Sequence, residues 1–204
     1  AATADVTITG GATNNLFGSS LTTSDLNADG KIDLIVGAYG YSSFTGRTYI
    51  FYNDGSIPTT AATADVTITG ETTSNNFGTS LTTGDLNTDG KTDLIVGAYG
   101  YSSFTGRAYI FYNDGSIPTT AASADVVITG EATNNYFGTS LATGDLNADG
   151  KTDLAVGAYG YSGRGKTYLY TWNDATITGE TTNNYFGVSL ATGDLNADGK
   201  TDLA

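Results

Sequence analysis

The chain has 204 residues and a formal net charge of −13, and its composition excludes several classes of protein. It contains no Cys and no His, which removes disulfide frameworks, thiol catalysis, the commonest general base and the commonest transition-metal ligand. Eight basic residues against 21 acidic ones offer no electrostatic footprint for nucleic acid, and no stretch approaches the roughly 18 apolar residues of a membrane span. A hydrophobic content of 39% is enough for a core, so we expect one folded region over residues 1–204.

Internal repetition organises this region. The second copy is nearly identical to the first, and the fourth is incomplete. The third copy lacks 11 residues of the linker that ends the first two, because its successor begins after an offset of 49 residues. Self-similarity at a fixed period predicts stacked units that bury their apolar faces against one another. The copies are residues 1–60, 61–120, 121–174 and 175–204.

Within one copy, the pattern predicts strands and turns in chain order. Alternation of apolar and polar residues predicts a strand over 6–9, a weaker strand over 17–23 and an aromatic strand over 48–52. A continuous apolar run predicts a buried strand over 33–37. Residues 40–46 read as a hairpin loop and 53–55 as a turn, and no window of 11 residues has helical spacing. Four strands per copy predict an all-β fold of four-stranded β-propeller blades, with about 3.5 blades in this chain. A β-helix is the competing repeat, but its coils are usually shorter.

One acidic motif recurs in every copy and accounts for 12 of the 21 acidic residues. Its pattern is Asp-x-Asn-x-Asp-Gly-Lys-x-Asp. Side-chain oxygens at places 1, 3, 5 and 9, with the backbone carbonyl of place 7, form the donor set that a hard cation such as Ca²⁺ takes. The glycine at place 6 permits the sharp turn. The candidate metal ligands are Asp25, Asn27, Asp29, Lys31 and Asp33; Asp85, Asn87, Asp89, Lys91 and Asp93; Asp145, Asn147, Asp149, Lys151 and Asp153; and Asp194, Asn196, Asp198, Lys200 and Asp202.

These loops differ from the helical EF-hand loop, which needs a bidentate Glu at place 12, where this chain has Val36 in the first copy. Since place 9 leads directly into a strand, we expect each loop to close a β-hairpin. A solvated Asp/Asn/Gly turn is the alternative, but four copies with unbroken spacing favour calcium, up to four ions. Four Ca²⁺ would change the net charge from −13 to −5. We expect a structural role, worth roughly 2.7 kcal/mol per site at 100 times Kd.

The residues at fixed distances around this loop resemble a known family. Phe17-Gly18, the loop from Asp25 to Asp33, and Gly37-Ala38 together look like the FG-GAP repeat of the integrin alpha-subunit propeller and its bacterial relatives. The pair recurs at Phe77-Gly78, Phe137-Gly138 and Phe186-Gly187. One departure is that Tyr39, Tyr99 and Tyr159 stand where the family usually has Pro. The resemblance implies radially arranged blades, calcium loops on one rim, and recognition or adhesion outside the cell.

Other constellations carry weaker signals. Residues 163–167 resemble a phosphate loop but lack its first glycine, so they read as a shortened hairpin. The Asp clusters could be read as a carboxylate pair for glycoside hydrolysis, but calcium accounts for them, and we expect no enzyme. Aromatic residues in the hairpin loops could stack on sugars or partner side chains, or pack between adjacent blades. These are Tyr41, Phe44, Tyr101, Phe104 and Tyr161.

Three functions fit the sequence. The first is a calcium-stabilised extracellular propeller for adhesion or recognition of a surface protein or glycan. The second is a structural subunit that assembles through its near-identical repeats into an extracellular filament or sheath. The third is a propeller associated with a hydrolase. The chain stops within the fourth copy's counterpart of the buried strand predicted over 33–37. We therefore expect either a continuation of the chain or other copies of itself to complete the ring.

Overall fold

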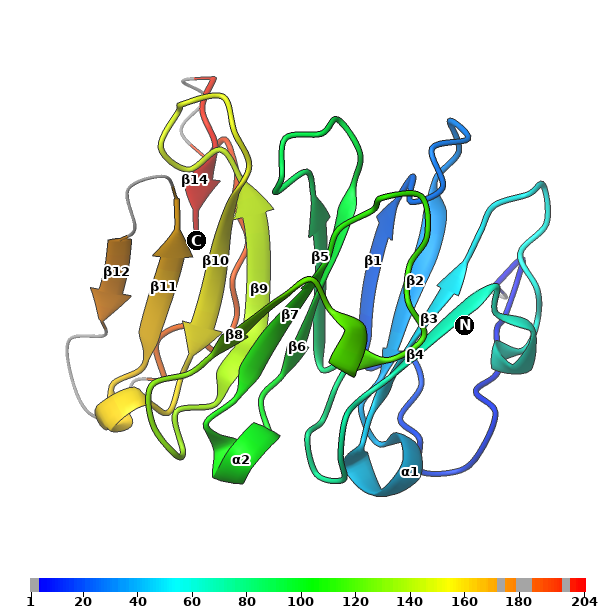
Figure 1. Cartoon of the computed structure of the whole chain (residues 1–204), viewed down its shortest axis with the longest axis horizontal. Coiled ribbons are helices and arrows are strands. Elements are labelled where there is room, and N and C mark those ends of the chain that lie inside the picture. The colour runs from blue at the N-terminus through cyan, green and yellow to red at the C-terminus, as the bar shows by residue number, and fades with distance from the viewer. Residues whose placement is uncertain (1–3, 172–174, 179–184, 196–198) are drawn as a thin grey trace.

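The computed structural model describes residues 4–171, 175–178, 185–195 and 199–204, and these form three four-stranded antiparallel sheets side by side (Figure 1). A two-stranded ribbon follows them. This confirms the all-β fold of four-stranded blades. The sheets consist of β1 (Ser20–Ser24), β2 (Asp33–Ala38), β3 (Arg47–Phe51) and β4 (Val66–Thr69); β5 (Ser80–Gly84), β6 (Asp93–Ala98), β7 (Arg107–Phe111) and β8 (Val126–Thr129); β9 (Phe137–Gly144), β10 (Asp153–Ala158), β11 (Lys166–Tyr170) and β12 (Ala175–Thr178); and the ribbon β13 (Thr192–Gly193) and β14 (Asp202–Leu203).

Helical structure is confined to single turns in the part of the chain that the structure describes. Two of these turns lie in the expected hairpin loops, where Ser42 and Ser43 take left-handed φ values of 47° and 57°. No described helix has the length or apolarity to cross a membrane. The turns are α1 (Tyr41–Phe44), α2 (Tyr101–Phe104), η1 (Ala61–Thr63), η2 (Ala121–Ser123) and η3 (Tyr161–Gly163).

Each sheet takes its fourth strand from the following sequence copy. The strand order is sequential, so β4, at the start of the second copy, pairs with β3 of the first. The prediction of a strand over 6–9 was therefore wrong, since only Thr9 forms a β-bridge there, while the same residues of the second copy form β4. Among the described residues, 6–9 pair with no third strand, whereas β4 pairs with β3.

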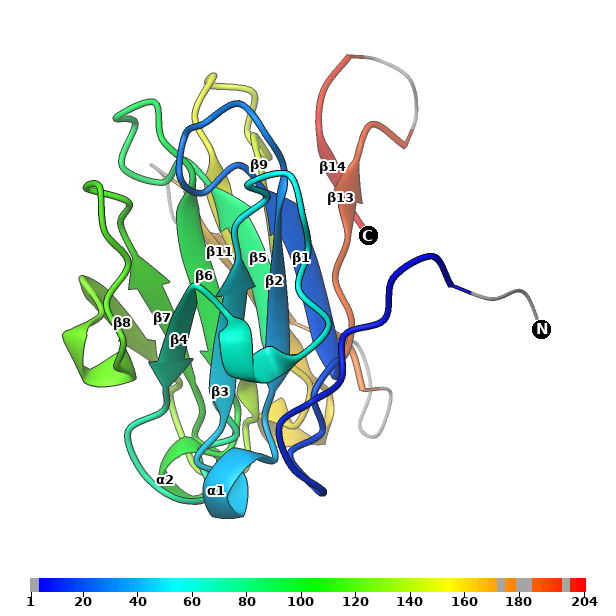
Figure 2. The same ribbon diagram turned by 90° about the vertical axis from the view of Figure 1, so that its right-hand side faces the viewer.

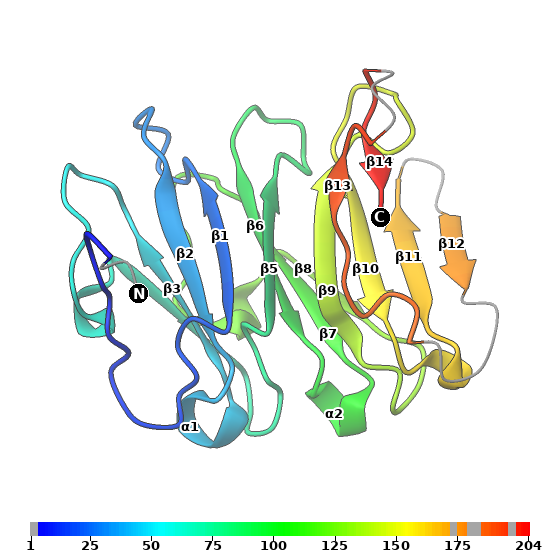
Figure 3. The same ribbon diagram turned by 180° about the vertical axis from the view of Figure 1, so that it is seen from behind.

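The sheets are arranged as a fan. The first strands β1, β5 and β9 neighbour one another, and β13 lies next to β9 (Figure 3). Seen from the side, the fourth strands β4 and β8 lie at the opposite edge from β1 (Figure 2). This is the arrangement of successive propeller blades. Closure of a ring remains a prediction.

The core lies between the faces of successive sheets. Ile35 and Ile50 of the first sheet belong to one buried cluster with Val96 and Tyr109 of the second. Phe77, the aromatic residue of the repeated Phe-Gly pair, packs edge-on against Tyr109 with ring centroids 5.4 Å apart. Because the second strand of each sheet is buried on both faces, β2, β6 and β10 contain short continuous apolar runs.

The glycines of the repeated motifs explain how closely the blades approach. Ser80 Oγ donates a hydrogen bond of 2.7 Å to the carbonyl oxygen of Gly138, which belongs to the Phe-Gly pair of the next copy. A Cβ on Gly97 would overlap that same carbonyl oxygen. Only glycine allows this approach, so the Phe-Gly and Gly-Ala signatures mark a contact between consecutive blades.

Candidate metal-binding loops

Each acidic loop connects the first two strands of a sheet at the upper rim in Figure 1, so it closes a β-hairpin as expected. In the first loop, the Asp25 carboxylate accepts N–H groups of Asp29 at 3.1 Å and Gly30 at 2.9 Å. Gly30 has a left-handed φ of 83° that favours glycine. The fourth loop repeats the second of these bonds, from Gly199 to Asp194, at 2.9 Å.

Places 3 and 5 are turned toward the loop backbone in the same way. Asn27 Oδ1 accepts the Asp29 N–H at 3.1 Å, and Asp29 Oδ1 accepts the Lys31 N–H at 2.8 Å. These bonds are Asx turns, which wrap the backbone around the side-chain oxygens. The Lys31 side chain is 50% exposed, in keeping with a place that would contribute only its carbonyl oxygen.

Place 9 has a different environment because its carboxylate is buried. Asp93 is 0% exposed, and it accepts the Leu86 N–H at 2.8 Å and the Asn113 N–H at 2.9 Å. It thereby ties its loop to the end of β7. Burial raises the pKa of Asp93, while the hydrogen bonds from Asn113 and Leu86 lower it. A cation beside this carboxylate would favour its charged form.

Places 1 and 3 share one donor, because Asp25 and Asn27 both accept the Asp29 N–H, whereas place 9 accepts N–H groups outside this set. No three acidic side chains among the described residues form a group that could hold a metal as they stand. Place 3 is an amide, and the carboxylate at place 9 turns to backbone N–H groups. Hard oxygen donors in one short loop nevertheless have the chemistry that Ca²⁺ takes. A bound ion would use places 1, 3 and 5 and share place 9 with its N–H donors. Asn196 and Asp198 lie outside the described residues, and the ligand set stays a prediction.

The hairpin tyrosines at the opposite rim pack beneath basic side chains. The Arg107 guanidinium lies 3.4 Å from the centroid of the Tyr101 ring and forms a 3.0 Å ion pair with Glu71. Arg47 lies 3.7 Å from the centroid of the Tyr41 ring. These aromatics therefore serve local packing. Residues 163–167 form the end of η3 and the start of β11, which supports the shortened hairpin.

A row of stacked aromatic rings runs along the same rim. Phe104 stacks on Tyr136 of the next copy at 5.0 Å, and Tyr136 stacks on Tyr159 at 4.7 Å. Phe104 therefore packs between blades, although it remains 40% exposed. Tyr99 stacks on Phe104 at 6.3 Å. Tyr99 and Tyr159, which stand where the family usually has Pro, thus belong to this row, a role that the sequence analysis did not assign.

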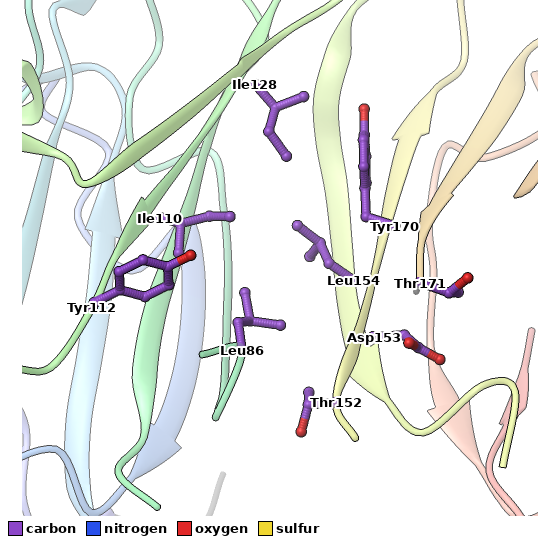
Figure 4. Close-up of a pocket in the computed structure, with 9 residues that line it drawn as sticks. All are labelled: Leu86, Ile110, Tyr112, Ile128, Thr152, Asp153, Leu154, Tyr170 and Thr171. Carbon is purple, nitrogen blue, oxygen red and sulfur yellow. The ribbon is translucent and has the colours of Figure 1, made fainter. Parts of the chain in front are cut away.

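A cavity of about 230 Å³ lies between the second and third sheets (Figure 4). Leu86, Ile110 and Ile128 on one side face Leu154 and Tyr170 on the other. The sequence analysis did not anticipate it. The signal that could have revealed it is the 11-residue deletion after the third copy.

The comparisons with known proteins agree with this geometry. The model of the FG-GAP repeat matches residues 17–51, 77–111, 137–170 and 186–204, more than half of the chain. The chain belongs to the FG-GAP repeat family. In this FG-GAP protein, each match begins at the phenylalanine of a Phe-Gly pair and includes one acidic loop.

The relatives of this FG-GAP protein are much longer. It is 34% identical over 165 residues to phosphatidylinositol-glycan-specific phospholipase D of Bos taurus, covering 74% of the chain and 19% of that protein. It is 35% identical over 159 residues to integrin alpha-IIb of Mus musculus, covering 72% and 15%. It is 40% identical over 111 residues to integrin alpha-7 of Homo sapiens, covering 52% and 9%. The chain thus spans less than a fifth of the length of these relatives.

Proposed function

We propose that the chain is a calcium-stabilised propeller module that binds a protein or glycan partner outside the cell. The observation that carries this proposal is the hydrogen-bond pattern of the loops. In each of the first three loops, backbone N–H groups turn toward the oxygens of places 1, 3 and 5. The similarity to integrin alpha subunits supports recognition or adhesion, and extracellular modules commonly bind calcium at about 10⁻⁴–10⁻³ M.

Calcium would act on the fold rather than on a reaction. An ion that binds only the folded state adds roughly 2.7 kcal/mol at 100 times its Kd, and independent sites add up. Because each loop joins the first two strands of a sheet, an ion there would hold the inner edge of that blade. It would also offset the repulsion among acidic side chains that share one loop.

Thermal unfolding in calcium and in EDTA tests this proposal. We expect calcium to raise the melting temperature and calorimetry to detect up to four ions per chain. The double variant Asp85→Asn and Asp89→Asn should remove one site, while Asp114→Asn, an exposed turn residue outside the loops, should leave the stoichiometry unchanged. Melting that EDTA does not shift, with no heat of calcium binding, would overturn the proposal.

Recognition can be tested separately with labelled protein on intact cells. We expect saturable binding in calcium that is lost in EDTA and that protease or glycosidase treatment of the cells abolishes. Binding that is not saturable would contradict recognition while leaving the calcium proposal intact.

Self-assembly is the second candidate, and the near-identity of the copies favours it. Divergent loops usually form specific binding faces, and here the loops hardly diverge. The apolar faces that stack blade on blade within the chain could also stack between chains. Light scattering and electron microscopy of the purified chain, with and without a chelator, should then show rings or filaments.

Association with a hydrolase is a third candidate, favoured by the similarity to phosphatidylinositol-glycan-specific phospholipase D. The match covers 19% of that enzyme, so the chain would be a module attached to such an activity. Turnover of a phosphatidylinositol-glycan substrate by the chain itself would show that the chain is an enzyme and not only a module attached to one.

A further inference from the structure

An ion pair at the start of the third strand is present in the second and third blades and lacks its acid in the first. In the second blade, Arg107 Nη1 lies 3.0 Å from Glu71 Oε2, and in the third, Lys166 Nζ lies 2.8 Å from Glu131 Oε1. The first copy has Gly11 at the place of these glutamates. The basic residue of the first blade is therefore left without the carboxylate that its counterparts have.

That residue, Arg47, is nevertheless held in the same way as Arg107. The Nε of each arginine donates a hydrogen bond of 3.1 Å to a threonine hydroxyl of the fourth strand, Thr69 and Thr129 respectively. The Arg47 guanidinium also lies 3.7 Å from the centroid of the Tyr41 ring. Among the described residues, no acceptor bonds the two terminal nitrogens of Arg47. The guanidinium is thus oriented by the fold, and its terminal N–H groups remain for a ligand.

A cavity of about 270 Å³ lies beside Arg47, where the glutamate of the other blades would be. A Cβ placed on Gly11 would meet no atom within 4 Å, so this glycine leaves the space open. Figure 2 shows α1 and the N-terminal segment, in blue, next to each other at the lower rim, where they enclose the cavity with the start of β3. The lining includes Gly11, Asn15, Tyr41, Arg47, Tyr49 and Ala62.

A second polar side chain of this cavity also lacks the partner that it has one blade later. In the second blade, Thr72 Oγ1 donates a 3.0 Å hydrogen bond to Asn75 Oδ1. The first copy has Ala12 at the place of that threonine, and the side-chain amide of Asn15 forms no hydrogen bond among the described residues. Asn75 is buried, whereas Asn15 is only partly buried. The cavity therefore offers a guanidinium and an amide that the chain itself does not satisfy.

The acidic loops do not oppose an anion at this place. They lie at the other rim, at the far end of β2 (Asp33–Ala38). Six residues of a strand span about 20 Å, whereas the screening length at physiological salt is about 8 Å. The net charge of the chain is thus screened here, and the guanidinium determines which ligand is favoured.

We propose that this cavity binds an acidic sugar through its carboxylate. Arg47 takes the carboxylate as Arg107 takes that of Glu71, and charge-assisted bonds of this kind are strong. A volume of about 270 Å³ is close to the roughly 300 Å³ at which ligand pockets begin, so it holds one ring. The Asn15 amide can bond a ring hydroxyl, which the side chain of an acidic amino acid lacks. This inference rests on the recognition part of the proposed function and assigns the glycan as the partner.

The probe is the methyl glycoside of glucuronic acid, titrated into the calcium-loaded chain. NMR should show saturable shifts at the Arg47 Nε–H and the Asn15 side-chain amide. Methyl glucoside, which has the ring without the carboxylate, should bind at least about tenfold more weakly. N-acetylglutamate amide, which has the carboxylate without the ring, should also bind more weakly than the glucuronide. Tighter binding of the glutamate compound would overturn the sugar and assign the cavity to an acidic side chain of a partner protein.

Three variants test the location. Gly11→Glu should abolish binding, because the chain then supplies its own carboxylate, and it should not lower the melting temperature. Arg47→Gln should weaken the glucuronide at least about tenfold, whereas Arg107→Gln, at the ion-paired position of the second blade, should leave binding unchanged. The double variant Glu71→Gly and Thr72→Ala gives the second blade the residues of the first, so calorimetry should find two sugar sites in place of one.

The proposal is overturned by NMR signals that do not move at tens of millimolar glucuronide, by equal binding of the glucuronide and the glucoside, or by a Gly11→Glu variant that still binds. These outcomes differ from failure of the proposed function. Saturable binding of the wild-type chain to cells without any binding of the glucuronide would refute the acidic sugar and leave recognition intact. Melting that EDTA does not shift would refute structural calcium and leave the sugar site intact.

Discussion

Replacing Asp93 by Ala is expected to destabilise the chain even when no calcium is present. The carboxylate is fully buried and accepts N–H groups of Leu86 and Asn113 at 2.8 and 2.9 Å. Each buried N–H left without a partner costs about 1–3 kcal/mol, so the two together should cost about 2–6 kcal/mol. For a chain of this size, that corresponds to a fall in melting temperature of roughly 4–24 °C.

The matched control is Asp85→Ala in the same loop. Asp85 accepts the N–H groups of Asp89 and Gly90 at an exposed position, where water can replace it, so we expect a loss below about 1 kcal/mol in EDTA. In calcium, Asp85→Ala should lose the stabilisation due to one ion as well. Urea unfolding in both buffers measures these differences. A loss below about 1 kcal/mol for Asp93→Ala in EDTA would refute the structural role of place 9.

Three further predictions concern the contacts between blades. Gly97→Ala should cost about 3 kcal/mol or more in urea unfolding, because its Cβ would overlap a backbone carbonyl, whereas Gly193→Ala, with open space around it, should change stability little. Gly11→Glu should stabilise the chain by about 1 kcal/mol, and this gain should be lost at high salt. Gly11 lies 36 residues before Arg47, the same separation as between Glu71 and Arg107, which form an ion pair in the second blade. Burial raises the pKa of Tyr109 to about 12, so stability should be unaffected by this group below pH 10, where both states keep the proton. The free energy of unfolding should then fall by about 3 kcal/mol as the pH rises to 12, because only the unfolded state ionises its Tyr109. An alkaline unfolding titration without such a loss would contradict this prediction.

The sequence predicted most of the strands because period-two patterning and turn residues coincide in every copy. The buried strand at 33–37 and the hairpins around it are found as predicted, since a run that is apolar on both faces fits only the middle of a sheet. The prediction of a strand over 6–9 was wrong because strand formation there depends on a pairing partner, which the local sequence pattern does not reveal. The short helical turns at 41–44 and 101–104 were also missed, since left-handed serines have no distinctive sequence signal.

The acidic loops were predicted from spacing, but the different environments of the Asp residues within each loop were not. Spacing shows that Asp25 and Asp33 belong to one loop, while burial decides that Asp33 turns to the N–H groups of Leu26 and Asn53. The cavity between the second and third sheets was missed for a similar reason. A deletion is visible in the sequence, but the empty space it leaves depends on what that segment covers in the neighbouring blade.

The offset between sequence copies and sheets has a practical consequence for anyone who divides this protein. The stretch that is duplicated along the chain and the stretch that folds as a unit are out of phase. A fragment cut at residues 61–120 would carry β4 of the preceding sheet and lose its own β8, whereas one cut at 77–129 would keep all four strands of one sheet. A break in the chain at the repeat boundary, between residues 60 and 61, would fall between β3 and β4 of one sheet, so the two pieces would stay joined by the hydrogen bonds between these strands.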